Sequence, residues 1–351
     1  MRIRNFIKEI VVYGIMFFIS ALMLSTFIYA QGDPADIMFY ERERLVAKLE
    51  YMKSNKNSID TVFIGSSMTE RGVVPEVFDE QTGLQSFNLG SAGVRSFRAL
   101  QIVDELIAAD SNTLKYVFLE IQPHLQDTAL NYKSNAAIFE TRWSLIPVYI
   151  EGFSLKTGLN TKELYFDMAR QLIYKYTGFG IKKQIKINLG LHTRDFYSEL
   201  LYEKVSDSKG FNDLDSEVEI RNEFLSREDR GEFMMQRARF HDIELPEYIK
   251  TDAFTKKIIS KINKLEEMGV KVFIIIPPRN NYLDYQLRQK HMYENNKITV
   301  IDLADYKEYP DFYFSDDFAY DPLHFNLAGA KKYTLELSKK FMTLANKTLV
   351  N

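Results

Sequence analysis

The chain has 351 residues, of which 46% are hydrophobic and 26% charged, so it is long enough for one large globular domain or two small ones. Its 45 basic and 48 acidic side chains leave a formal net charge of -3, and so small a net charge argues against nucleic acid as a partner. Because the chain has no cysteine, disulfides, thiolate metal sites and cysteine nucleophiles are excluded.

The first feature along the chain is an uncharged apolar stretch, residues 10–30. At about 1.5 Å per residue, a helix of this length crosses the bilayer core of about 30 Å. Arg2, Arg4 and Lys8 precede the stretch and acidic residues follow it, so residues 1–9 are expected in the cytoplasm and the rest of the chain outside it. A cleaved signal peptide is the alternative, but its apolar core is usually only about 7 to 15 residues long, which favours a single-pass membrane anchor.

Residues 31–58 show helical spacing followed by a polar run, which predicts a membrane-proximal helix and a linker. From residue 59 to 351, short apolar runs alternate with helical patterns, as a parallel sheet covered by helices on both faces requires. The predicted strands are 61–65, 86–90, 116–121, 271–277 and 297–303, and the clearest predicted helices lie near 96–109, 254–268 and 326–346. The expected fold is a three-layer α/β sandwich, in which function gathers at the carboxyl ends of the strands.

One long segment, about residues 125–250, interrupts this alternation with aromatic and charged residues at mainly helical spacing. We interpret it as a helical insertion between the third and fourth strands. Two roles stay open for it: it adds packing, or it forms a lid or a docking surface beside the strand ends.

Two short motifs at opposite ends of this pattern carry candidate chemistry. The first strand ends in a Gly-Ser-Ser turn that would expose Ser67, and a serine hydroxyl becomes a nucleophile only beside a base. Asp321 and His324 stand three residues apart just before the last helix, where the carboxylate can orient the imidazole that takes the serine proton. The sequence therefore predicts a triad of Ser67, His324 and Asp321.

These motifs make the chain similar to the GDSL family of serine esterases and acyltransferases, also called SGNH hydrolases. The resemblance covers about residues 60–125 and 254–346 and implies a flavodoxin-like sheet. In the first block, Gly65-Ser66-Ser67-Met68 corresponds to Gly-Asp-Ser-Leu, so Ser66 stands where the family usually has aspartate. The last block, Asp321 to His324, matches the family pattern fully.

The two middle blocks of the family imply an oxyanion hole. Asn88-Leu89-Gly90-Ser91-Ala92-Gly93 matches the second block and assigns the backbone N–H of Gly93 to the oxyanion, together with that of Ser67. The third block departs from the family, because Glu120-Ile121-Gln122-Pro123 replaces Gly-x-Asn-Asp. Gln122 then occupies the asparagine position, and its amide can donate the same kind of hydrogen bond.

The anchor and the altered blocks look most like the membrane-tethered members of this family that act in teichoic-acid D-alanylation and alginate O-acetylation. This resemblance implies an extracytoplasmic serine acyltransferase that takes an acyl group from a donor and O-acetylates or otherwise O-acylates a cell-surface or secreted polysaccharide. The implied partner is a multispanning membrane O-acyltransferase, and neither a metal nor an organic cofactor is called for. A membrane-anchored carbohydrate esterase or deacetylase would use the same residues, and a non-catalytic assembly subunit is a third alternative.

The remaining histidines and one arginine are weaker candidates. Each histidine stands alone in the sequence and is interpreted as a structural or surface residue: His124, His192, His241 and His291. Arg279 follows the fourth strand, where it would meet an anionic substrate or form a salt bridge.

Overall fold

The structure is a computed structural model that describes residues 8–17, 19–20, 43–92, 96–109, 112–121, 199–213, 218–242, 253–279 and 283–350, with the single residues 6, 23 and 166. The chain forms two compact units, one of Met1–Val46 and Leu125–Ser198 and the other of Ala47–His124 and Glu199–Asn351. The sheet and the candidate site both belong to the second unit.

In the first unit, residues 8–17 are helical and their described side chains are exposed. None of the helices within the described ranges has the length and hydropathy that crossing a bilayer requires. Residue 18, residues 21–22 and residues 24–30 of the predicted span lie outside the described residues.

The second unit is built on one sheet of five parallel strands in the order β2-β1-β3-β4-β5. The strands are β1 (Thr61–Ile64), β2 (Ser86–Asn88), β3 (Tyr116–Glu120), β4 (Lys271–Ile276) and β5 (Thr299–Asp302). Each lies within a strand predicted from the sequence, so the expected α/β fold with a central parallel sheet is confirmed. The order reverses direction between β1 and β3, and such a switch point is where parallel α/β sheets place their sites.

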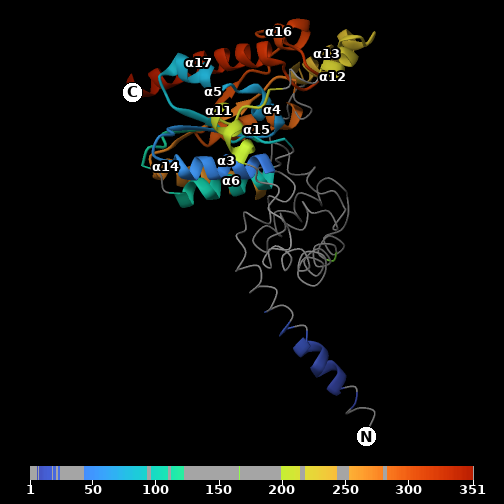
Figure 1. Ribbon diagram of the computed structural model, residues 1–351, viewed down its shortest axis with the longest axis vertical. Helices are drawn as coiled ribbons and strands as arrows, with labels where there is room; N and C mark the ends of the chain where they lie inside the picture. Colours follow the sequence, from blue (N-terminus) through green and yellow to red (C-terminus); the bar gives the residue numbers. More distant parts are fainter. Residues whose placement is uncertain are drawn as a thin grey trace. The chain divides into compact units, whose positions relative to one another are not determined.

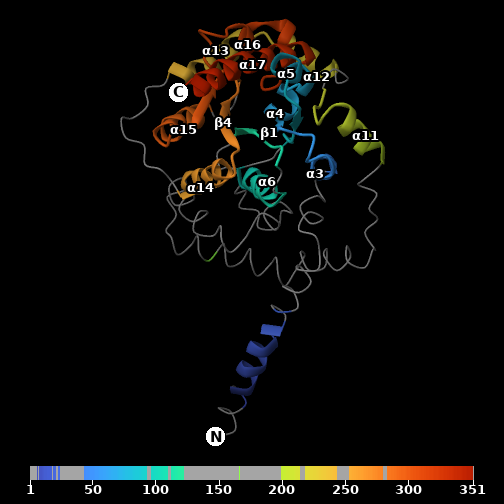
Figure 2. The ribbon, with the colours of Figure 1, turned by 90° about the vertical axis from the view of Figure 1, so that its left-hand side faces the viewer.

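Helices cover both faces of the sheet (Figure 1 and Figure 2). One face carries α5 (Pro75–Thr82) and α17 (Leu327–Val350), which pack against each other, and the opposite face carries α6 (Ser96–Ala109), α14 (Ala253–Glu267) and α3 (Glu43–Ser54). The edge of the sheet formed by β4 and β5 carries α15 (Leu283–Asn295). The helices predicted near 96–109, 254–268 and 326–346 are confirmed as α6, α14 and α17.

Aromatic side chains form the core beneath α17. Strand register places Phe63, Phe118 and Phe273 side by side, and ring centroids lie 4.7 Å apart for the first pair and 5.2 Å for the second. Phe341 of α17 packs edge-on against Phe118, with centroids 5.3 Å apart. Burying each of these side chains contributes about 1.5 to 3 kcal/mol, so α17 is held firmly on the strands that carry the candidate site.

The segment between β3 and β4 contributes helices to the second unit. Besides α14, the described ones are α11 (Glu199–Asp207), α12 (Val218–Leu225), α13 (Arg230–Ala238) and the 3-10 helix η3 (Arg239–Asp242). Most of the predicted insertion at about 125–250, including residues 125–165 and 167–198, lies outside the described residues. Neither of its two expected roles is tested by the described part.

Candidate active site

The turn after β1 presents Ser67. Gly65 and Ser66 leave the strand, and the short helix α4 (Ser67–Gly72) begins at Ser67 itself. Ser66 caps this helix, because its side-chain oxygen accepts a hydrogen bond from the backbone N–H of Met68 at 3.1 Å. Among residues 61–70, Ser67 alone is not fully buried, so the turn exposes the predicted nucleophile at the carboxyl end of the strand.

The predicted base comes from a tight turn between the 3-10 helix η4 (Asp316–Phe318) and α17. Oδ1 of Asp321 accepts the backbone N–H groups of Leu323 at 2.6 Å and of His324 at 2.7 Å. After the turn, Asn326 begins α17, because its Oδ1 accepts the backbone N–H of Gly329 at 2.9 Å. The carboxylate thus shapes the loop that carries the imidazole as well as facing it.

The two distant motifs meet in one hydrogen-bonded chain. Nε2 of His324 lies 2.8 Å from Oγ of Ser67, and Nδ1 of His324 lies 2.7 Å from Oδ2 of Asp321. Both distances are within the reach that proton transfer requires. We assign the proton on the ring to Nδ1, because a carboxylate can only accept it, which leaves Nε2 free to accept from the Ser67 hydroxyl.

Electrostatics favour the ionised form of Asp321. Burial acts to raise the pKa of Asp321, but the hydrogen bond and charge of His324, with the backbone N–H groups of His324 and Leu323, bring that pKa below its usual value. A carboxylate that stays ionised can hold the imidazole in the required tautomer and stabilise it when it takes up a proton.

A buried threonine ties the base side of the site to the nucleophile side. Oγ1 of Thr334, on α17, accepts the backbone N–H of Val74 at 2.9 Å and lies within hydrogen-bond distance of the carbonyl of Gly72 at 3.1 Å. Gly72 ends α4 and Val74 precedes α5. The helix that follows His324 is therefore bonded directly to the helix that begins with Ser67.

Glu120, the last residue of β3, fixes the turn that carries Ser67 through hydrogen bonds. The residue is 1% exposed, and its carboxylate accepts hydrogen bonds from the backbone N–H groups of Ser66 and Thr69, both at 3.1 Å. The hydroxyls of the same two residues donate to it at 2.8 Å and 2.5 Å. Four donors compensate for the burial of this carboxylate and fix the backbone on both sides of Ser67.

The same carboxylate explains why the turn begins with glycine. A Cβ at Gly65 would overlap Thr69 Oγ1 and would come within 2.7 Å of Cβ of Glu120. Glycine is needed there because Glu120 and Thr69 occupy the space that a side chain would fill.

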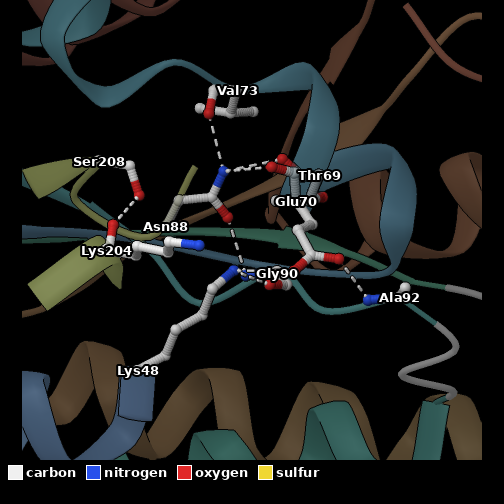
Figure 3. A network of polar contacts seen from close by, with 9 residues as sticks. All are labelled: Lys48, Thr69, Glu70, Val73, Asn88, Gly90, Ala92, Lys204 and Ser208. Atoms are coloured by element: carbon white, nitrogen blue, oxygen red, sulfur yellow. Dashed lines mark hydrogen bonds and ion pairs between the residues drawn. The ribbon is translucent and has the colours of Figure 1, made fainter. Parts of the chain in front are cut away.

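A second polar network lies beside α4 and includes a buried lysine from α3 (Figure 3). Nζ of Lys48 lies 3.4 Å from Oε1 of Glu70 and donates to the carbonyl of Gly90, and both charged side chains are almost wholly buried. Oε2 of Glu70 accepts the backbone N–H of Ala92 at 2.7 Å, while Asn88 joins the strand end to the backbone of α4. This network joins α3, α4 and the loop after β2.

Some of the predicted site residues come together in the structure and others do not lie in its described part. Ser67, His324 and Asp321 come together as expected, whereas Gly93 and Gln122, the predicted oxyanion donors, lie outside the described residues. Arg279, for which the sequence suggested a substrate anion or a salt bridge, is buried and donates instead to backbone carbonyls.

Sequence reasoning missed the roles of Glu120 and of the Lys48 and Glu70 pair. A signal for Glu120 was present, since it is the only charged residue in the otherwise apolar run of the third predicted strand. A charge at the end of a buried strand has to meet donors there. For Lys48 no comparable local signal exists, because it lies among other charged residues of a helix.

The fold and site define a parallel α/β protein with a Ser-His-Asp hydrogen-bonded chain at the carboxyl edge of its sheet. No model of a known protein family matches this chain. No match is found among curated proteins either.

Proposed function

We propose that this chain is a serine acyl-transfer enzyme of the SGNH type, anchored in the membrane with its catalytic domain outside the cytoplasm, that O-acylates a cell-surface or secreted glycan. The observation that carries the proposal is the continuous hydrogen-bonded chain from Ser67 through His324 to Asp321. The membrane anchor rests on the uncharged apolar stretch of residues 10–30, whereas the glycan acceptor and the neighbouring O-acyltransferase rest on the resemblance of the sequence blocks.

In the first half-reaction, the Ser67 hydroxyl gives its proton to Nε2 of His324 while Oγ attacks the acyl carbonyl. The tetrahedral intermediate collapses, the bond to the donor's leaving group breaks, and His324 returns the proton to that leaving group. The product of this half-reaction is an ester on Ser67.

In the second half-reaction, a sugar hydroxyl attacks the ester on Ser67 and His324 takes its proton. Collapse of the second intermediate moves the acyl group to the sugar and returns the proton to Oγ of Ser67. Asp321 stabilises the imidazolium formed in each half. If water replaces the sugar, the same residues perform hydrolysis, which makes an anchored esterase or deacetylase the second candidate.

A comparison of cell-surface glycan from three strains tests the proposal. The strains carry the wild-type gene, no gene, or the Ser67→Ala variant, and the acyl ester content of the glycan is measured by mass spectrometry. Transfer predicts less ester in both altered strains, whereas hydrolysis predicts more.

Ser67→Ala protein that accumulates normally and supports wild-type ester content would contradict the catalytic proposal and favour an assembly subunit. His291→Ala is the matched control, since His291 lies exposed on α15 and its loss should leave the ester content unchanged.

A further inference from the structure

Arg279 lies in the turn after β4, and its side chain is directed at the loop that carries the base. The residue is 1% exposed. Its Nη1 donates to the carbonyl oxygens of Asp321 at 3.1 Å and His324 at 3.3 Å, and its Nε donates to the carbonyl of Phe312. One guanidinium therefore contacts the backbone at both ends of the Asp321 to His324 turn.

The guanidinium remains charged in this buried place. Burial lowers the pKa of Arg279 to about 10, with the nearby charge of Asp321 opposing that shift. This pKa is still far above neutrality, so the side chain keeps its positive charge. It also lies over the ring of Phe325, 5.3 Å from the centroid, directly after His324 in the chain.

The backbone at this position is unusual for an arginine. Arg279 has a φ of 63°, in the left-handed region that glycine adopts at little cost and that other residues adopt rarely. Arg237 of α13 supports this conformation, since its Nη1 donates to the backbone carbonyl of Arg279 at 3.0 Å. This backbone costs more for arginine than for glycine, and the contacts of the buried Arg279 side chain offset that cost.

We infer that Arg279 is a positioning residue, which holds the turn from Asp321 to His324 so that Nε2 of the imidazole stays within reach of Ser67. The inference deepens the proposed function and rests on it. The hydrogen bonds of Arg279 to the base loop (Asp321–His324) go to backbone carbonyls, so it acts through His324 and takes no part in proton transfer. A planar group with several N–H donors can contact three carbonyls at once, which the single ammonium of lysine cannot do in the same geometry.

The test uses purified full-length protein and compares Arg279→Gly with Lys297→Gly. Lys297 has nearly the same backbone, with a φ of 62°, but is exposed in the turn before β5. Both variants therefore relieve the same backbone strain, and only one removes the contacts to the base loop. The readouts are the rate at which a fluorophosphonate probe labels Ser67 and the kcat and KM for hydrolysis of p-nitrophenyl acetate.

For Arg279→Gly we expect labelling and kcat to fall by about 10- to 100-fold with KM nearly unchanged, since a displacement of about 1 Å in a catalytic group costs rate on this scale. Lys297→Gly should match the wild type. Millimolar guanidinium chloride should restore part of the rate of Arg279→Gly, by entering the space left by the side chain, and should not accelerate the control.

A folded Arg279→Gly variant that labels at the wild-type rate would overturn the inference, as would an equal loss in Lys297→Gly. If Arg279→Gly fails to fold, Arg279→Lys decides, because it keeps the charge and most of the packing. We expect labelling about 10-fold slower than the wild type in Arg279→Lys, and a wild-type rate would show that the carbonyl contacts are not needed. A wild-type protein that is not labelled at all would instead count against the proposed function.

Discussion

Oγ of Ser66 donates a hydrogen bond of 2.8 Å to Oε1 of Glu120, although the two residues are 54 positions apart in the chain. The carboxylate at the end of β3 thereby holds the residue that precedes the candidate nucleophile. In the GDSL family, which the sequence blocks resemble, an aspartate usually stands at the position of Ser66. Here the acidic group that supports the turn comes from the neighbouring strand.

Glu120→Gln should destabilise the protein and slow the labelling of Ser67. The amide nitrogen of glutamine cannot accept a hydrogen bond, so it would leave a buried donor of the turn without an acceptor. We expect the free energy of unfolding in urea to fall by about 1 to 3 kcal/mol. The control is Glu80→Gln on the exposed face of α5, which should change the free energy of unfolding by less than about 0.5 kcal/mol. Equal stabilities for both variants would contradict the role given to Glu120.

Gly65→Ala should destabilise the protein because its Cβ meets Thr69 and Glu120 in a space that is already filled. Overpacking of this kind costs about 1 to 3 kcal/mol, measured by urea denaturation. Gly231→Ala on α13 should instead stabilise the protein. No atom lies within 4 Å of the added Cβ, and alanine favours a helix over glycine by about 0.5 to 1 kcal/mol. A neutral effect at Gly65 would show that the turn can move away from Glu120.

Lys48→Met should leave the carboxylate of Glu70 buried beside an apolar side chain. Removing one partner of a buried ion pair costs about 3 to 5 kcal/mol, whereas removing both costs less, so adding Glu70→Gln should recover part of the lost stability. Lys53→Met is the control on the same helix, because its ion pair with Glu105 is exposed and contributes only about 0 to 1 kcal/mol. Similar losses in the two single variants would contradict this account of the network.

Asp321 should make the free energy of unfolding depend on pH in the acidic range. Because its folded pKa lies below the usual value, it contributes stability that is fully present above the unfolded pKa of about 4 and is lost as the pH falls through the folded pKa. The stability difference between the wild type and Asp321→Asn should therefore shrink as the pH falls below about 4. Urea denaturation of both proteins at a series of pH values measures it. A difference that stays constant to the lowest pH would mean that Asp321 is not favoured in its ionised form.

The strands and the triad could be predicted because their signals are local. An apolar run such as 271–277 predicts its own strand, and the turn at Gly65 and the pair of Asp321 and His324 are each readable within a few residues. The turn at Gly65 follows β1, and the pair of Asp321 and His324 lies in the connection after β5. The two motifs can meet because the carboxyl ends of parallel strands share one edge of the sheet.

The supporting residues could not be assigned in this way. Glu120 and Lys48 act through partners that are distant in sequence, and whether a charged residue is buried with its donors depends on the folded arrangement. Arg279 was misinterpreted for a similar reason, since donation to backbone carbonyls leaves no charge pattern in the sequence. Its left-handed backbone conformation gives no signal in residue type either.

The most direct test of the central claim is covalent labelling of the purified protein with a fluorophosphonate probe, followed by mass spectrometry of the modified peptide. The account predicts that the probe modifies Ser67 and not Ser66, that Ser67→Ala and His324→Ala abolish the modification, and that His291→Ala leaves it intact. Folded wild-type protein with an unreactive Ser67, or labelling that survives the loss of His324 unchanged, would contradict it.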